Sequence, residues 1–262
     1  MKRLATFGAL LFLVSVLVGC SSLADKVRPS TDPCPVSDTK EADQALNQAV
    51  SVTMVFAEPS PISSSFAVYE GSSIAINGYV LTAAHVVKKA HTLAPSDVEI
   101  SVMALGSSSA RIPTSAELVY YNEVADVALL KSSSLLYAGG TEPPALEFAS
   151  ANDLKLDTPV CVFSVTGGFV RGIIATPEFE NDYSKSWFAF GSNDFWVAKG
   201  SSGGPIYARI NGKLEIIGIV IKRTFVHHSE DTMSGALGVD IVEAVNLINA
   251  EMPGLLDLKP VE

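Results

Sequence analysis

The chain has 262 residues, of which 48% are hydrophobic, and a formal net charge of −10 at pH 7. This length can bury a substantial core in one large or two small domains. The acidic balance disfavours nucleic acid and anionic membrane surfaces as electrostatic partners.

The first residues have the layout of an export signal. Lys2 and Arg3 precede an apolar run from Leu4 to Val18, which is shorter than the roughly 20 apolar residues that span a membrane. The small residue before Cys20 makes this segment resemble a bacterial lipobox, in which the cysteine is lipidated and becomes the first residue of the mature protein. We therefore expect residues 1–19 to be a lipoprotein signal peptide and Cys20 to carry the lipid. An ordinary signal peptide that is cut elsewhere and an uncleaved anchor are the alternatives.

Residues 20–45 are predicted to form a flexible tether. They are rich in Ser, Asp, Pro and Lys, and three prolines break any regular element. The chain has serines after Cys20 instead of an aspartate. By resemblance to sorted lipoproteins, this implies the outer membrane, facing the periplasm, in a Gram-negative host.

Short strands dominate the rest of the chain. Apolar runs separated by Gly, Asn, Ser and Pro begin at residues 49–56 and continue as far as Val239. Two such runs flank Asn211-Gly212, which predicts a hairpin there. Residues 241–252 have apolar side chains at helical spacing, so a C-terminal helix is expected.

Three segments indicate nucleophilic catalysis. His85 directly follows an apolar run, Asp126 opens another, and Ser202 lies in a glycine-rich turn. A serine hydroxyl needs a neighbouring base to become a nucleophile, and an imidazole serves as that base near neutral pH. A carboxylate would fix the tautomer of the imidazole. The glycines would let the amides of Gly200 and Ser202 converge on the oxygen that becomes negative.

The sequences LTAAHVV (81–87), ADVALLK (125–131) and KGSSGGP (199–205) resemble the signature segments of trypsin-like, chymotrypsin-fold serine proteases, especially of their bacterial HtrA-type branch. The resemblance implies an all-β fold of two six-stranded antiparallel β-barrels with a C-terminal helix. It covers residues 46–252 and leaves 253–262 as a C-terminal tail. It also implies that His85 is the general base, Asp126 its orienting carboxylate, Ser202 the nucleophile, and Gly200 with Ser202 the oxyanion donors, without a cofactor.

The chain departs from this family at some positions. Ser201 replaces the aspartate that pairs with a new amino terminus in secreted trypsins, so activation by that route is not expected. Lys199 stands where proline or glycine is commoner. The peptide-binding (PDZ) domain that usually follows an HtrA-type protease is not expected in this chain, which ends ten residues past Met252.

The resemblance also places a substrate pocket beside Trp196 and the strand Gly218-Ile219-Val220. Because no acidic residue lies at these points, a preference for Lys or Arg before the scissile bond is not expected. A small or medium apolar side chain is the predicted preference.

Cys34 and Cys161 form an even pair once Cys20 is lipidated, so a disulfide is one possibility. A buried free thiol at Cys161 is the other, because it lies inside an apolar run. The cysteine and histidine spacings indicate no metal site.

Two functions follow from this sequence. The first is a lipid-anchored serine endopeptidase that cleaves envelope or extracellular proteins through an acyl-enzyme, with protein or peptide substrates and a membrane contact through the lipid. The alternative is a catalytically silent, protease-fold binding lipoprotein. The intact triad and both glycines of the turn favour the enzyme. The sequence leaves the oligomeric state open.

Overall fold

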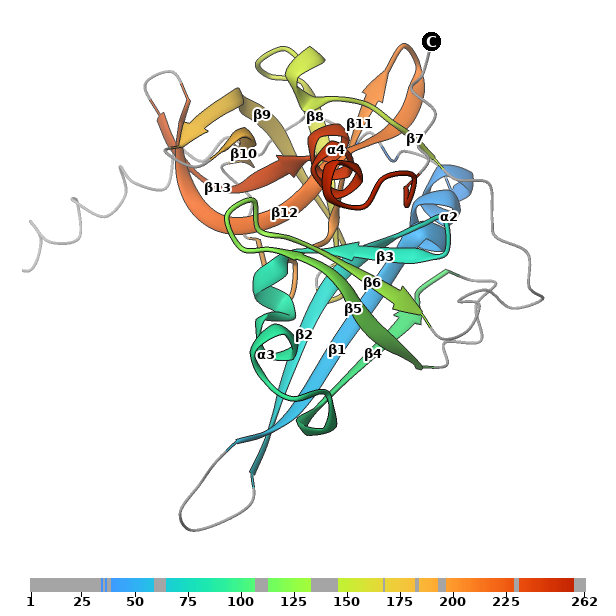
Figure 1. Cartoon of the computed structure of the whole chain (residues 1–262). Coiled ribbons are helices and arrows are strands. Elements are labelled where there is room, and N and C mark those ends of the chain that lie inside the picture. Colours follow the sequence, from blue (N-terminus) through green and yellow to red (C-terminus); the bar gives the residue numbers. More distant parts are fainter. Residues whose placement is uncertain are drawn as a thin grey trace, which may run out of the picture. The chain divides into compact units, whose positions relative to one another are not determined.

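The computed structural model describes residues 34, 36, 39–58, 65–106, 113–132, 146–166, 168–181, 184–192, 197–228 and 231–256. The predicted signal peptide, Cys20, Gly167 and Trp196 lie outside the described residues. All of the described residues belong to one compact unit, the second of the two into which the chain divides at residues 31 and 32. Figure 1 shows its two groups of strands in successive colours, blue to green for the first and yellow to red for the second.

The first group is a closed antiparallel barrel in the order β1-β2-β3-β6-β5-β4. Along β1, Val50, Val52, Met54 and Phe56 are buried and alternate with more accessible residues, which is the period of two expected of a strand with one face in a core. Its strands are β1 (Ala49–Glu58), β2 (Ser65–Ile76), β3 (Tyr79–Thr82), β4 (Val98–Ala104), β5 (Thr114–Asn122) and β6 (Val127–Ser132).

The second group also closes on itself. The strands run in the order β11-β8-β9-β10-β13-β12, and β12 pairs with β11 to complete an antiparallel ring. The short strand β7 (Glu147–Phe148) adds a parallel pairing to β12. The ring consists of β8 (Pro159–Ser164), β9 (Gly168–Asn181), β10 (Ser184–Ser192), β11 (Pro205–Ile210), β12 (Lys213–His228) and β13 (Asp231–Asp240). The predicted double barrel is therefore confirmed.

Local sequence explains where several elements turn and end. Asn211 and Gly212 both have positive φ, 50° and 83°, and join β11 to β12 in the predicted hairpin. Asp240 begins the predicted C-terminal helix, α4 (Ile241–Glu251), since its carboxylate accepts hydrogen bonds from the amides of Val242 and Glu243. Short helical elements complete the fold: α3 (Lys88–Thr92), η2 (Ala84–Val86), η3 (Pro95–Asp97) and η4 (Ala151–Asp153).

The prediction that the tether extends to residue 45 is wrong in its last part. Residues 39–45 belong to the helix α2 (Thr39–Gln48), which packs against β1. Ala45 is fully buried, and its carbonyl accepts a hydrogen bond from the hydroxyl of Tyr207 at 3.1 Å. The prolines that suggested a tether all precede α2. The amino-acid composition of residues 39–48 does not by itself predict a helix, which is instead stabilised by its packing against the barrels.

Cys161 forms a disulfide and is not a free thiol, the two possibilities that the sequence left open. Cys34 is bonded to Cys161 in the buried strand β8, with their Cα atoms 5.4 Å apart and 127 positions between them in sequence. The bond ties the segment before α2 to the second barrel. Closing so long a loop in the unfolded chain stabilises the fold by about 4 to 5 kcal/mol in the chain-entropy model.

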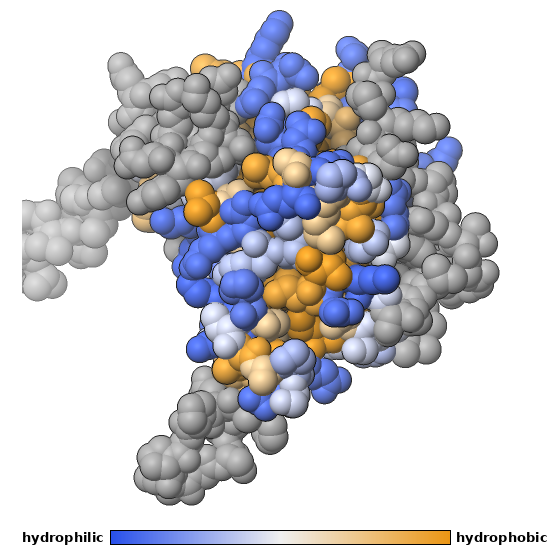
Figure 2. All heavy atoms as spheres, viewed as in Figure 1, coloured by the Kyte–Doolittle hydropathy of each residue, from blue (hydrophilic) through white to orange (hydrophobic). Residues whose placement is uncertain are grey.

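The residues after α4 are also partly ordered. Leu256 is buried, and Asn249 both donates to its carbonyl at 2.7 Å and accepts from its amide at 3.1 Å. The start of the predicted tail thus packs on the C-terminal helix. Figure 2, viewed from the same side as Figure 1, shows hydrophilic residues over much of the visible surface and an apolar area over the first barrel.

Candidate active site

The strand pairing of the first barrel brings His85 and Asp126 together. β3 and β6 are antiparallel neighbours with Thr82 opposite Ala128, so the end of β3 lies beside the start of β6. His85 lies in η2, just after β3, and Asp126 directly precedes β6. The amide of Ala84 donates to the Asp126 carbonyl at 3.1 Å, which joins the two segments.

The Asp126 carboxylate fixes the imidazole with both of its oxygens. Its Oδ2 lies 2.8 Å from Nδ1 of His85, and its Oδ1 accepts a hydrogen bond from the His85 amide at 2.9 Å. An ionised carboxylate can only accept, so Nδ1 carries the hydrogen and Nε2 keeps its lone pair. The Asp126 side chain is 18% exposed and that of His85 44% exposed. The ring is therefore oriented by a mostly buried carboxylate and remains accessible to a reactant.

Ser202 lies in a tight turn that leads into β11. Gly200 and Gly203 have φ values of 94° and 81°, a conformation that favours glycine. The amide of Gly203 donates to the Val220 carbonyl at 2.7 Å, and that of Gly204 donates to the Ser201 carbonyl at 2.8 Å. The first bond holds the turn against β12 of the second barrel, and the second closes the turn itself.

The two barrels meet at this turn. The amide of Ser72, on β2, donates to the Ser202 carbonyl at 2.9 Å. A Cβ atom at Gly203 would lie 2.2 Å from Oγ1 of Thr82 and 3.0 Å from the amide nitrogen of Ala83. The turn that carries Ser202 thus packs on the residues that lead from β3 to His85.

The hydroxyl of Ser202 and the imidazole of His85 are not yet hydrogen-bonded. Among the described residues, no hydrogen bond joins Ser202 Oγ to the ring. Bonds of this kind are often long in substrate-free enzymes and shorten when the substrate binds. The structure therefore brings the histidine and aspartate into contact and places the serine turn beside them.

Two hydroxyl groups hold the backbone before Ser202 from one side. Oγ1 of Thr166 donates to the Lys199 carbonyl at 2.8 Å, and Oγ of Ser72 donates to the Gly200 carbonyl at 2.8 Å. In a trans peptide the N–H points away from the C=O, so holding the Lys199 carbonyl directs the Gly200 amide to the other side. No acceptor within the described part of the chain takes the amide hydrogens of Gly200 and Ser202. These two donors are the predicted oxyanion site.

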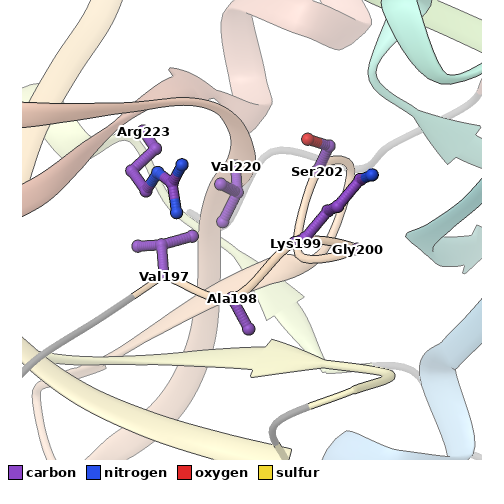
Figure 3. A pocket seen from close by; sticks show the side chains of 7 residues that line it. All are labelled: Val197, Ala198, Lys199, Gly200, Ser202, Val220 and Arg223. Atoms are coloured by element: carbon purple, nitrogen blue, oxygen red, sulfur yellow. The ribbon is translucent and has the colours of Figure 1, made fainter.

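A cavity of about 300 Å³ opens beside this turn (Figure 3). Val220, a predicted pocket residue, is one of its walls. The other two predicted pocket residues of the described chain, Gly218 and Ile219, do not line the cavity, and Ile219 is fully buried. The described residues that line it are Val197, Ala198, Lys199, Gly200, Ser202, Val220 and Arg223.

Sequence reasoning missed Arg223 because of a bulge in β12. Val220 lies opposite Gly238, and the next aligned pair is Lys222 with Leu237, so Ile221 is an extra residue in the strand. The extra residue shifts the alternation of side chains by one. Arg223 therefore shares a face with Val220, where an uninterrupted strand would have directed it to the opposite face.

Comparisons with known proteins agree with this geometry. A family model described as "Trypsin-like peptidase domain" matches residues 64–219. The chain is similar to the crystal structure of an inactive serine-to-alanine mutant of Rv3671c from M. tuberculosis H37Rv, with 22% identity, a TM-score of 0.54, and 90% of this chain and 100% of that chain covered. It is also similar to the crystal structure of Deg5, with 18% identity, a TM-score of 0.57, and 80% and 93% covered. No curated protein matches the chain.

Proposed function

Because the chain belongs to the family of trypsin-like peptidase domains, we propose that it is a serine endopeptidase that uses His85, Asp126 and Ser202 as its catalytic triad. The observation that carries this proposal is the paired contact of the Asp126 carboxylate with the ring and the amide of His85, next to the turn of Ser202. A trypsin-like domain implies protein or peptide substrates.

The reaction starts at the hydroxyl of Ser202. Its oxygen attacks the carbonyl carbon of the scissile peptide bond while its proton passes to Nε2 of His85. The carbonyl oxygen becomes negative and accepts hydrogen bonds from the amides of Gly200 and Ser202. Asp126 stabilises the imidazolium that forms, through the 2.8 Å contact at Nδ1.

Breakdown of this intermediate releases the first product. The C–N bond breaks, Nε2 of His85 gives its proton to the leaving amine, and the acyl group stays on Ser202 as an ester. A water molecule then gives a proton to Nε2 of His85 and attacks the ester carbon. The bond from the acyl carbon to Oγ of Ser202 breaks, and His85 returns the proton to Oγ, which releases the acid and restores the serine hydroxyl.

A fluorophosphonate probe tests this assignment, because it phosphonylates only an activated serine. We expect the mature wild type to be labelled and the Ser202→Ala variant to be unlabelled while keeping the melting temperature of the wild type. Ser101→Ala, on β4 of the first barrel, is the matched control and should label normally. A folded wild type that refuses the probe would contradict the proposal and favour the silent binding lipoprotein.

The proposed enzyme is exported and lipid-anchored through Cys20, on the outer membrane facing the periplasm in a Gram-negative host. The Cys34–Cys161 disulfide supports export, since such bonds persist in oxidising compartments. Envelope or extracellular proteins are then its substrates. Within the described ranges, no helix is long and apolar enough to cross a membrane.

A further inference from the structure

The residues just before Ser202 form a β-turn. The amide of Ser201 donates to the Ala198 carbonyl at 3.2 Å, so Lys199 and Gly200 are the two central residues of the turn. Gly200 has φ of 94°, whereas φ of Lys199 is not positive. A positive φ at the second central residue alone defines a type II turn. The peptide between Lys199 and Gly200 is the central peptide of this turn and carries one of the predicted oxyanion donors.

A type II turn has a close alternative, the type I turn. The two forms share the closing hydrogen bond and differ mainly in the direction of the central peptide, which is reversed between them. Glycine adopts either sign of φ, so Gly200 permits both forms. In the type I form, the Lys199 carbonyl would face the oxyanion position in place of the Gly200 amide. A contact from outside the turn must therefore hold this peptide in the catalytic orientation.

The hydroxyl of Thr166 makes this contact. From the turn between β8 and β9, its Oγ1 donates to the Lys199 carbonyl at 2.8 Å. The side chain also packs on the next residue, since a Cβ atom at Gly200 would lie 3.1 Å from Cγ2 of Thr166. Within the described ranges, no other donor reaches the Lys199 carbonyl. Thr166 is thus the residue that holds the central peptide of the turn.

Buried Ser164 orients the Thr166 hydroxyl. Oγ of Ser164 lies 3.1 Å from Oγ1 of Thr166 and accepts a hydrogen bond from the Thr166 amide at 3.3 Å. Because a carbonyl can only accept, the hydroxyl hydrogen of Thr166 goes to Lys199, and the Ser164 hydroxyl donates to Thr166. Ser164 is 1% exposed. The donor is therefore ordered by a buried partner, although Thr166 itself lies at the surface.

We propose that Thr166 is a positioning residue of the enzyme, whose hydroxyl keeps the central peptide turned so that the Gly200 amide is ready as an oxyanion donor. This inference rests on the proposed function. Thr166 touches no reacting atom and acts only through the Lys199–Gly200 peptide. Because the oxyanion contact strengthens as Ser202 attacks, loss of the hydroxyl slows the chemical step and leaves binding of the reactant nearly unchanged.

Reaction with a small alkyl fluorophosphonate measures this effect, because its phosphonyl oxygen uses the same donors when Ser202 attacks. The two quantities are the rate constant of the bound complex (kinact) and the half-saturating concentration (KI). We expect Thr166→Val, which has nearly the same shape, to lower kinact about 10- to 100-fold with little change in KI, since loss of a whole oxyanion donor costs about 10²- to 10³-fold. Thr166→Ser keeps the hydroxyl and should restore most of kinact.

Thr114→Val is the matched control. Oγ1 of Thr114 also donates to a carbonyl, that of Val102 at 3.3 Å, but in the first barrel. This variant should react like the wild type. An unchanged kinact in Thr166→Val, or an equal loss in Thr166→Ser, would overturn the proposal.

The direction of the peptide can also be observed directly, because the dipeptide Lys-Gly occurs once in the chain, at residues 199–200. Protein labelled with carbonyl-¹³C lysine and ¹⁵N glycine therefore gives a single amide signal that carries both labels in a nuclear magnetic resonance spectrum. We expect this signal in unbound Thr166→Val to shift or broaden relative to the wild type. Phenylboronic acid, which forms a tetrahedral adduct with an activated serine, should bring it to the position of the wild-type adduct. A signal in unbound Thr166→Val that is identical to that of the wild type would overturn the proposal.

These measurements separate the proposal from the proposed function, because the signal of the unbound Lys199–Gly200 peptide does not depend on catalysis. A wild type that reacts with the fluorophosphonate no faster than Thr166→Val overturns the role of Thr166 alone. A folded wild type that refuses the probe overturns the catalytic assignment and, with it, the catalytic role of Thr166.

Discussion

Oγ of Ser72 donates a hydrogen bond to the carbonyl oxygen of Gly200 at 2.8 Å, although the two residues are 128 positions apart and belong to different barrels. The same hydroxyl oxygen accepts the amide of Val165 at 3.1 Å. Ser72 is fully buried. One small side chain therefore links β2, the turn after β8 and the backbone that presents the oxyanion donors.

The Ser72→Ala variant should lower kcat by about 10- to 100-fold with little change in KM. The Gly200 carbonyl loses its partner, so the amides that stabilise the transition state become less well ordered, and loss of a whole oxyanion donor costs about 10²- to 10³-fold. The measurement is turnover per active site, counted with the fluorophosphonate probe. Ser73→Ala is the control, because Oγ of Ser73 is equally buried and donates instead to the Val50 carbonyl of the first barrel. A similar kcat loss in both variants would mean that Ser72 acts through general stability.

Asp126→Asn should reduce kcat by about 10⁴-fold while the protein stays folded. The amide would favour the wrong tautomer of His85, a change of that size in Ser-His-Asp triads. Asp126 has φ of 58°, a conformation that asparagine adopts well, so the backbone should tolerate the change. Glu123→Gln is the control, since Glu123 pairs with Lys88 at the surface. A loss of less than tenfold in Asp126→Asn would show that another group orients His85.

Gly203→Ala should destabilise the fold by more than about 3 kcal/mol, and activity should be lost with it. Its Cβ would lie 2.1 Å from the Ser72 carbonyl oxygen and 2.2 Å from Oγ1 of Thr82, so the two barrels would have to separate. Gly212→Ala has a similar φ of 83° but no atom within 4 Å of the added carbon, and should cost only about 1 kcal/mol. Urea unfolding compares the two. Equal costs would show that backbone conformation, and not the contact between barrels, matters at Gly203.

Loss of the Cys34–Cys161 bond should lower the free energy of unfolding by about 2 to 5 kcal/mol, and the melting temperature by roughly 5 to 15 °C. Thermal unfolding of Cys34→Ser, with and without a thiol reductant, measures this. The variant should melt like the reduced wild type and ignore the reductant. A wild type whose melting temperature is unchanged by full reduction would contradict the expected contribution.

Cys20→Ser should abolish incorporation of an alkyne-labelled fatty acid and release the protein from the membrane fraction. The lipid needs the thiol of the mature first residue. Cys34→Ser serves as the control, because it also removes one thiol, and should still be labelled. Fatty-acid labelling that persists in Cys20→Ser would place the modification elsewhere.

The double barrel and the His85–Asp126 contact are what the resemblance of three short segments to trypsin-like proteases implies, and local signals predict the strands and the hairpin from which the barrels are built. Asp126 directly precedes β6, His85 lies three residues after the end of β3, and Asn211-Gly212 marks its hairpin by conformational preference alone. These local preferences act in the same way in any fold in which the two strands pair.

Three features depend on tertiary structure and could not be predicted. The bulge at Ile221 has no sequence signature, so the direction of Arg223 was hidden. The partner of Ser72 lies 128 positions away, which no local pattern reveals. Helix α2 is stabilised by packing on β1, whereas its composition resembles that of the preceding polar segment.

The disulfide between Cys34 and Cys161 also determines which part of the fold receives a force that is applied to the amino-terminal end of the chain. A pull on the chain before Cys34 passes through this bond directly into β8 of the second barrel. The covalent path then bypasses α2 and the whole first barrel, including His85 and Asp126. If the proposed lipid on Cys20 anchors the chain, a force from the membrane would reach the second barrel without passing along the part of the chain that carries His85 and Asp126.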